Sequence, residues 1–332
     1  MNKTTAKKEQ AVPCVTDLAT VDWQPARNGF GTGLVEAGRA NSNVVALSAD
    51  LTESIRIEAF SKEFPAQFVE IGVAEQNMMG IAAGLALSGK IPFVASYAVF
   101  NPGRNWDQLR VSVVYSQANV KIIGAHAGIS VGPDGATHQA LEDVAITRVL
   151  PDLVVVVPTD MIEARKAVHA IVSYNGPVYY RMGREKVATV TTEETPFVLG
   201  KANLLRGGSD VTICANGPLV YEALLAAEQL EKAGISAEVL AVHTVKPLDS
   251  EAILKSVRKT SAMVTAEEAQ VTGGLGGAIA ELLGENHPVP MQRIGVKDRF
   301  GESGKPDELM DAYGLRAKDI LKAAQAVHKR KK

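Results

Sequence analysis

The sequence predicts an α/β protein of two doubly wound domains, and three observations support this prediction. Short apolar, β-branched runs alternate with helical patterns along most of the chain. Continuous apolar strands between helices are typical of a parallel sheet that is covered on both faces. The alternation stops once, at the polar stretch EKVATVTTEETP, and then resumes. The length of 332 residues also fits about two domains of ordinary size.

We expect the first domain to span residues 21–184. Its expected strands are residues 44–50, 68–73, 91–97, 120–126, 153–158 and 177–182. Its expected helices are residues 30–40, 75–88, 105–117, 139–149 and 160–174. The first ten residues, MNKTTAKKEQ, lack the apolar segment of a secretory signal, and we expect residues 1–20 to form a flexible arm.

We expect residues 185–197 to form a linker and residues 198–330 to form the second domain. The expected strands there are residues 210–214, 237–241, 262–267 and 288–293. The expected helices are residues 218–234, 250–259, 275–284, 306–313 and 316–328.

Composition narrows the class of partner. The formal net charge of −2 argues against nucleic-acid binding, which requires a basic surface. The apolar runs are far too short to span a membrane. The two cysteines, Cys14 and Cys214, do not suggest a disulfide framework or a zinc site, and this usage fits a cytoplasmic protein.

Polar and aromatic residues gather where the expected strands of the first domain end. Ligands of open α/β sheets bind outside the carboxyl ends of strands, so these residues predict a site. The residues at or just beyond these strand ends are Asp50, Glu75, Tyr97, Phe100, His126 and Arg181.

Glu75 is the most informative of these residues because it begins a helix directly after an apolar strand. A carboxylate in the first turn is favoured by the helix dipole, which is one explanation for its position. Its neighbours Val73, Ala74, Met78 and Met79 are apolar, and such surroundings also suit a carboxylate that shares a proton with a bound group. The same helix is rich in glycine and alanine, which suits either tight helix packing or an interface.

The loop HAGISVGPDGATHQ (residues 126–139) carries His126, Asp134 and His138 on an irregular, glycine-rich backbone. Two histidines suggest a metal, but only Asp134 offers a third ligand, so we expect this chain to hold no metal by itself. Arg27, Ser54, His126 and Arg181 suit an anion, because the planar guanidinium matches phosphate oxygens. The four come from separate segments, and sequence alone does not show that they converge.

Three motifs together resemble the transketolase family. They are AEQN within VEIGVAEQNMMGIAAGLALSGKIPFVASYAVF, DGATHQ within GISVGPDGATHQALEDVAITRVLPDLVVVVPTD, and YYR within PVYYRMGR. The resemblance covers about residues 20–328 and is closest to the C-terminal subunit of split, two-subunit transketolases. It implies a pyrimidine-binding domain for thiamine diphosphate, followed by the transketolase C-terminal domain.

The resemblance also implies roles for individual residues. Glu75 would bond the ring nitrogen of the aminopyrimidine, and Tyr97 and Phe100 would pack around that ring. His138 would lie near the reacting carbonyl, and Asp134 would bond a substrate hydroxyl. Asp50 would lie beside the substrate channel. The residues that match the sugar-phosphate grip are Arg27, Ser54, His126 and Arg181.

Two departures from the family pattern matter. Full-length transketolases carry a further aromatic residue three positions beyond Phe100, where this chain has Gly103; the ring pocket is then either looser or completed by Trp106. The chain also lacks the GDG motif that binds the metal and the diphosphate. The resemblance therefore implies an N-terminal partner subunit that carries this motif, holds most of the contacts to Mg²⁺ or Ca²⁺, and completes an α2β2 assembly.

The expected function is transfer of a two-carbon ketol unit from a ketose phosphate to an aldose phosphate, active only with the partner subunit. Four alternatives stay open. They are a related enzyme for branched or sulfonated sugars, a deoxyxylulose-phosphate-synthase-like enzyme, the β subunit of a 2-oxoacid dehydrogenase, and a non-catalytic orphan subunit. The short length counts against the second, and DGATHQ with Arg181 fits the third poorly.

Overall fold

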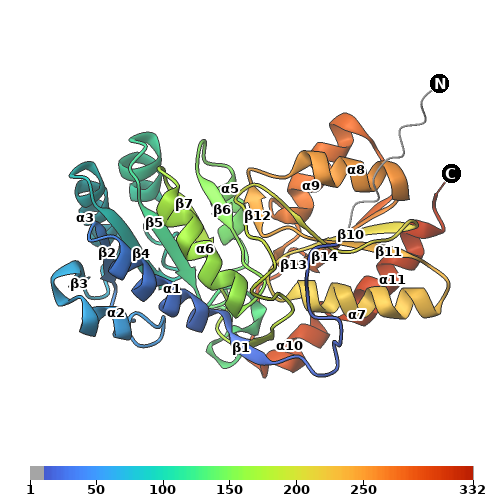
Figure 1. The fold of residues 1–332 in the computed structure, drawn as a ribbon, viewed down its shortest axis with the longest axis horizontal. Helices are drawn as coiled ribbons and strands as arrows, with labels where there is room; N and C mark the ends of the chain where they lie inside the picture. The colour runs from blue at the N-terminus through green and yellow to red at the C-terminus, as the bar shows by residue number, and fades with distance from the viewer. Residues whose placement is uncertain (1–10, 332) are drawn as a thin grey trace.

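The computed structural model describes residues 11–331, which form two lobes side by side, each built on an open sheet (Figure 1). The sheet of the first lobe has seven strands in the order β12-β6-β7-β5-β4-β2-β3, all parallel except β12. Its strands are β2 (Val44–Ser48), β3 (Phe68–Glu70), β4 (Ile91–Tyr97), β5 (Lys121–Ala125), β6 (Val154–Val156), β7 (Val178–Arg181) and β12 (Thr244–Lys246).

Helices cover both faces of this sheet, as its continuously apolar strands require. One face packs against α1 (Ala26–Ala40), α2 (Glu58–Glu63) and α6 (Met161–Ser173). The other face packs against α3 (Glu75–Leu87), α4 (Trp106–Gln108), the π-helical η2 (Leu109–Tyr115) and α5 (Asp143–Arg148). Two 3-10 segments, η1 (Pro65–Gln67) and η3 (Ile129–Asp134), lie in the loops.

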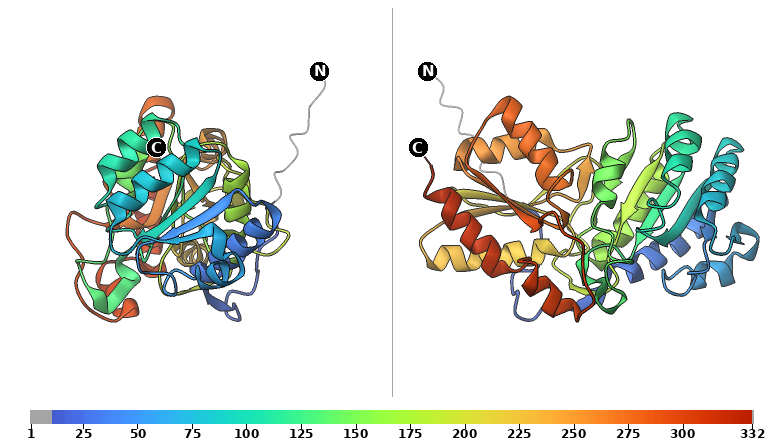
Figure 2. Two further views of the ribbon diagram at one scale, coloured as in Figure 1. Left: turned by 90° about the vertical axis from the view of Figure 1, so that its left-hand side faces the viewer. Right: turned by 180° about the vertical axis from the view of Figure 1, so that it is seen from behind.

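The second lobe repeats this architecture with five strands in the order β14-β13-β10-β11-β9, of which only β9 is antiparallel. The strands are β9 (Asn203–Arg206), β10 (Val211–Ala215), β11 (Ala237–Ala241), β13 (Met263–Gln270) and β14 (Met291–Val296). One face packs against α7 (Leu219–Lys232), α10 (Pro306–Ala312) and α11 (Ala317–His328), and the other against α8 (Ser250–Thr260) and α9 (Leu275–Asn286). Figure 2 shows the two layered lobes from the side and from behind.

The two lobes are joined by pairings that the sequence pattern does not reveal. Strand β12 follows β11 of the second lobe but pairs antiparallel with β6 of the first. Strand β1 (Trp23–Pro25) pairs with β8 (Lys186–Ala188), which begins the segment between the lobes. The buried carboxylate of Asp160 caps α6 and also accepts hydrogen bonds from the backbone N–H groups of Val190 and Thr191, at 2.9 and 2.7 Å. These contacts fix the first lobe relative to the second.

The α/β prediction is confirmed, and every expected strand and helix overlaps an observed one. The short elements at edges and in loops, namely β1, α2, β8, β9 and β12, were not predicted. Such elements are too short to show a period of their own.

The first ten residues of the expected arm lie outside the described part of the chain. Residues 11–20 do not form a free arm. The N–H groups of Val12 and Val15 donate to the carbonyls of Leu204 and Val190, and Leu18 is buried in the core of the second lobe. Among residues 11–331, no helix is both long and apolar enough to cross a membrane.

The Asp160 contacts generate a stability prediction. Asp160→Ala should lower the free energy of unfolding by about 3–5 kcal/mol, because buried N–H donors of Val190, Thr191 and Glu163 lose their acceptor. Chemical denaturation measures this loss. Glu285→Ala removes an exposed carboxylate that makes no hydrogen bond or ion pair with any described residue, and it should change stability by less than about 0.5 kcal/mol. Equal effects of the two substitutions would contradict the proposed role of Asp160.

Candidate active site

Four aromatic or imidazole rings meet beyond the carboxyl ends of β4 and β5. Tyr97 ends β4, and its ring stacks on His126, which follows β5, at 4.0 Å between centroids and 24° between planes. Phe100 lies 6.3 Å from Tyr97, and His138 approaches the rings of Tyr97 and Phe100 edge-on, at 6.2 and 5.5 Å. The structure therefore brings together four residues that come from three segments of the sequence. Their faces form a shelf suited to a flat ligand.

Positive charge gathers beside this ring cluster. Arg27 lies at the start of α1, and its Nη1 donates a 2.7 Å hydrogen bond to the carbonyl oxygen of Ser54. Burial lowers the pKa of Arg27, and so do the charges of Arg56 and Arg184. The Nε of Arg27 is buried and has no hydrogen-bond partner among the described residues. Three neighbouring guanidinium groups with an unused donor suit an anionic ligand.

His126 lies between the rings and these charges, and it is only 2% exposed. Burial lowers its pKa to about 3, and the charges of Arg27, Arg184 and His138 act in the same direction. The imidazole is therefore neutral at physiological pH, with one N–H donor and one acceptor nitrogen. Its Nδ1 has no partner in the described chain, which leaves it available to a ligand.

The backbone is strained around the same site. Asp50, Arg56 and His126 adopt positive φ angles of 60°, 69° and 51°, a conformation that residues other than glycine rarely adopt. Such conformations persist only where the surrounding structure imposes them, and they concentrate at functional sites. His126 in the ring cluster and Arg56 beside Arg27 both have this conformation, which Gln117, Asp152, Ser261 and Asp298 adopt elsewhere in the described chain.

Glu75 is the first residue of α3, and only 1% of it is exposed. Its Oε1 accepts a 2.9 Å hydrogen bond from Ser96 Oγ, on the interior strand β4. Its Oε2 accepts a 2.6 Å bond from Nη1 of Arg104, whose guanidinium carbon lies 4.5 Å from the centroid of the Phe100 ring. Burial and ionic pairing thus go beyond what capping of a helix requires.

Arg181 does not join the positively charged cluster around Arg27. It is buried in β7, where its Nε donates to Asp143 Oδ2 at 2.8 Å and its Nη2 donates to the carbonyl oxygens of Ala140 and Glu268. These contacts make it part of the packing between β7, α5 and the second lobe. The cluster instead contains Arg184, the second arginine of YYRMGR. Because Arg184 lies beyond the strand end, it reaches the site that Arg181 cannot.

Asp134 and Asp50 lie outside the ring cluster, and His138 makes a further contact besides those with the aromatic rings. Asp134 ends η3 and accepts a 3.4 Å hydrogen bond from Arg184. His138 Nδ1 lies 2.9 Å from the hydroxyl of Thr137. Asp50 is exposed beyond the end of β2, and its backbone N–H donates to Glu70 at 2.7 Å.

Trp106 does not complete the ring pocket. Its Nε1 donates to the carbonyl oxygen of Ile146 at 2.9 Å, and its ring packs against the core beneath α3 and α5. A Cβ at position 103 would lie 2.0 Å from the carbonyl oxygen of Val99, so this backbone admits only glycine. The side chain beside Phe100 is instead that of Arg104.

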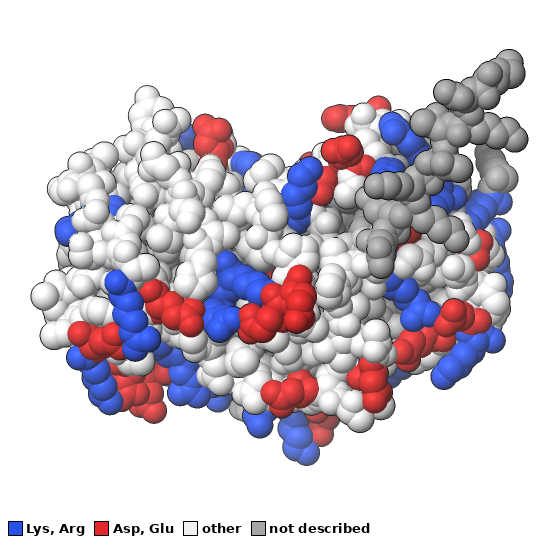
Figure 3. All heavy atoms as spheres, in the orientation of Figure 1, with Lys and Arg blue, Asp and Glu red and all other residues white. Residues whose placement is uncertain are grey.

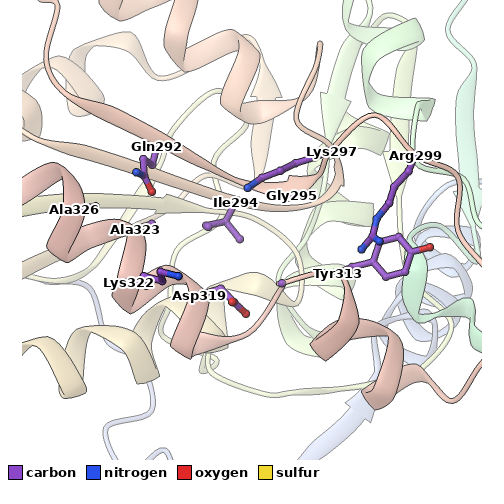
Figure 4. Close-up of a pocket in the computed structure, with 11 residues that line it drawn as sticks. Gln292, Ile294, Gly295, Lys297, Arg299, Tyr313, Asp319, Lys322, Ala323 and Ala326 are labelled. Atoms are coloured by element: carbon purple, nitrogen blue, oxygen red, sulfur yellow. The ribbon is translucent and has the colours of Figure 1, made fainter.

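The structure offers one other hollow, and its described residues offer no metal site. A groove of about 360 Å³ between β14 and α11 is lined by Lys297, Arg299 and Lys322, which are exposed (Figure 4). Among residues 11–331, no group of three or more histidine, cysteine, aspartate or glutamate side chains is arranged to hold a metal. The ring and arginine cluster of the first lobe is thus the stronger candidate, because it combines buried polar atoms with backbone strain.

Helix α3 presents an uncharged outer face. Added Cβ atoms at Gly80 and Gly84 would meet nothing within 4 Å, and Val73, Ile81 and Leu87 are exposed. Few charged side chains lie over this part of the surface in the space-filling view (Figure 3). Gly80 and Gly84 therefore face outward, whereas Ala82 and Ala83 are buried in the core between α3 and the sheet.

Comparisons with known proteins agree with this geometry. Residues 23–189 match the transketolase pyrimidine binding domain, and residues 200–320 match the transketolase C-terminal domain. The chain is 50% identical to a 6-deoxy-6-sulfo-D-fructose transketolase subunit of Clostridium sp. MSTE9 (90% of this chain, 92% of the relative). It is 44% identical to one subunit of the apulose-4-phosphate transketolase from Phocaeicola vulgatus (90% of this chain, 96% of the relative).

A solved structure described as an inactive β4 tetramer of a split gene transketolase shares the fold. It matches with a TM-score of 0.88 and 45% identity, and the match covers 93% of this chain and 99% of that one.

The different positions of Arg184 and Arg181 predict different consequences of substitution. Arg184→Met should weaken binding of inorganic phosphate or sulfate about 10-fold or more, because a charge-assisted hydrogen bond is lost from the cluster. Stability should change little. Arg181→Met should instead lower stability by about 3 kcal/mol or more, since it leaves the buried Asp143 with the hydroxyl of Tyr179 but without its counter-charge. Isothermal calorimetry and chemical denaturation separate the two effects, and the reverse pattern would restore Arg181 to the site.

The burial of His126 predicts that its ring does not titrate near neutral pH. With a folded-state pKa of about 3 against an ordinary value of 6.5, the neutral form contributes stability that is present above pH 6.5 and decreases as the pH falls toward 3. NMR titration of the His126 ring should show no protonation between pH 5 and 8. A midpoint near 6.5 would contradict this description of the site.

Proposed function

We propose a function from the premise that this chain belongs to the transketolase family. It is the C-terminal, pyrimidine-binding subunit of a thiamine-diphosphate-dependent transketolase, and it is active only with a separate N-terminal subunit. The observation that carries the proposal is the buried carboxylate of Glu75, which lies at the start of α3 and pairs with Arg104, whose guanidinium lies over the Phe100 ring.

The described residues fit one half of the cofactor. Glu75 would bond the ring nitrogen of the aminopyrimidine, and the aromatic faces of Tyr97 and Phe100 would enclose that ring. No described cluster of oxygen or nitrogen ligands suits a metal, and the sequence has no GDG motif. We therefore assign the diphosphate and its Mg²⁺ or Ca²⁺ mainly to the partner subunit, so that the complete site lies between chains.

Thiamine diphosphate, when bound, supplies the reactive carbon and the electron sink for cleavage of a carbon–carbon bond beside a carbonyl. The residues of this chain position the ring and move protons. Glu75 would hold a proton at the ring nitrogen. His138 would donate to or accept from the substrate oxygens near that ring, and Asp134 would bond a hydroxyl.

The positively charged cluster sets the substrate class. Arg27, Arg184 and neutral His126, together with Ser54, would bind the anionic end of a sugar, and Asp50 would lie beside the substrate channel. The reaction proposed is transfer of a two-carbon ketol unit from a ketose phosphate to an aldose phosphate. A sulfonated or branched sugar is a second candidate, because the relatives named above are transketolase subunits for sulfofructose and apulose phosphate, and guanidinium groups bind sulfonate as well as phosphate.

The uncharged outer face of α3 is where we place the main contact between subunits. Gly80, Gly84 and Ile81 leave this helix smooth enough for a second backbone to approach closely. The face begins at Val73, two residues before Glu75, so subunits that meet there would close over the ring pocket. An α2β2 assembly with the N-terminal subunit is the arrangement we propose.

Replacement of the Glu75 carboxylate tests the proposal. Co-expressed with the partner subunit and supplied with thiamine diphosphate and Mg²⁺, Glu75→Gln should lose at least about 100-fold in kcat, because the amide cannot exchange a proton with the ring. The variant should still co-purify with the partner. Glu53→Gln, at an exposed carboxylate, is the matched control and should keep full activity. Unchanged turnover of Glu75→Gln would remove Glu75 from the mechanism.

A separate measurement identifies the substrate class. It compares the kcat/KM of the wild-type complex for phosphorylated ketoses with its kcat/KM for sulfonated ketoses.

A further inference from the structure

We propose that the side chain of Arg104 occupies the position of the heterocycle while the chain is unliganded. Its guanidinium lies there against Glu75 and Phe100, and the heterocycle displaces it on binding. This inference rests on the proposed function, since it assigns the vacated position to the aminopyrimidine ring.

The contacts of Arg104 match those that a flat nitrogen heterocycle would make. Its Nη1 donates to Glu75 Oε2 at 2.6 Å, and its guanidinium carbon lies 4.5 Å from the centre of the Phe100 ring. A guanidinium is planar, carries N–H donors in its plane and stacks on aromatic faces. An aminopyrimidine that bonds Glu75 and stacks on Phe100 needs the same two partners, so the two groups compete for one position.

The burial of Glu75 shows which contact must break. Only 1% of the Glu75 side chain is exposed, and each carboxylate oxygen already accepts a hydrogen bond. The donor to Oε1 is Ser96, which is fully buried in the interior strand β4. The donor to Oε2 is Arg104, whose side chain is 42% exposed. A ligand from solution therefore reaches the carboxylate by displacing Arg104.

The local backbone allows the side chain to leave without a rearrangement of the loop. Asn101 and Asn105 are fully buried and anchor the loop, since Asn101 Nδ2 donates to the carbonyls of Val94 and Ile123, and Asn105 Nδ2 donates to the carbonyl of Glu75. Gly103 holds the chain against Val99. Arg104 thus projects from a fixed backbone, and rotation of its side chain toward solvent opens the pocket.

Pairing with Arg104 stabilises Glu75 before the cofactor ring binds. A buried carboxylate without a partner destabilises a fold, and Arg104 supplies a counter-charge while the chain lacks its cofactor. The ring then takes over as the partner of Glu75. Arg104 therefore stabilises the unliganded chain, and the cost of its displacement weakens cofactor binding.

The test measures thiamine diphosphate affinity of the complete complex with Mg²⁺, by isothermal calorimetry. Arg104→Ala should bind the cofactor about tenfold more tightly, which corresponds to ~1.4 kcal/mol. The same substitution should lower the thermal denaturation midpoint of the unliganded chain. Arg110→Ala removes an exposed arginine from the same segment that does not pair with Glu75, and it should leave both quantities unchanged. In a Glu75→Ala background the gain from Arg104→Ala should disappear.

A second measurement distinguishes displacement from a merely structural role. Methylguanidinium at millimolar concentration should compete with thiamine diphosphate in the Arg104→Ala complex, because it can enter the vacated position. It should not compete in the wild-type complex. If Arg104→Ala assembles poorly, Arg104→Lys serves instead, since it keeps the charge, lacks the planar face, and should tighten binding to a smaller extent.

Weaker or unchanged cofactor binding by both variants would overturn the displacement role while leaving the proposed function intact, provided that the wild-type complex binds. Absence of cofactor binding by every complex, the wild type included, would instead reject the proposed function, and the inference with it.

Discussion

The structure depends on one buried carboxylate. Glu75 begins α3 at the edge of a parallel sheet, with Ser96 of the interior strand β4 on one oxygen and Arg104 on the other. Keeping a charged group out of water requires this full set of donors. The requirement explains why Gly103 presses against Val99, which places Arg104, and why Asn101 and Asn105 are buried in a loop. The same arrangement creates a position where a flat heterocycle can meet a carboxylate and an aromatic face.

The sheet that positions Glu75 also creates the positively charged cluster. Strands β4 and β5 end side by side, so Tyr97 and His126 stack, and the start of α1 brings Arg27 to the same edge. Burial keeps His126 neutral among arginines, so it can donate and accept hydrogen bonds without adding repulsion. One sheet topology therefore places the aromatic rings and the positively charged cluster next to each other.

Periodic patterns and strand ends in the sequence predicted much of the fold and the site, but not the features that side-chain direction decides. The parallel strands, the covering helices and the gathering of Tyr97, Phe100 and His126 at one edge followed from apolar runs and their ends, whereas the place of His138 beside them was implied only by the family resemblance. Arg181 was expected in the anion grip, but it lies within the strand, where Asp143 pairs with it; Arg184, which was not among the expected residues, lies beyond the strand end and near Arg27. Strand β12 was missed because its pairing with β6 joins distant segments. Nothing in the sequence indicated that Arg104 would contact Glu75.

The central claim is that this chain holds only the heterocycle and that another polypeptide holds the diphosphate. The most direct measurement is calorimetric titration of thiamine diphosphate with Mg²⁺ into this chain alone, the partner alone, and the mixture. We predict tight, stoichiometric binding for the mixture and weak binding for each chain alone. Equally tight binding by this chain alone would contradict the claim.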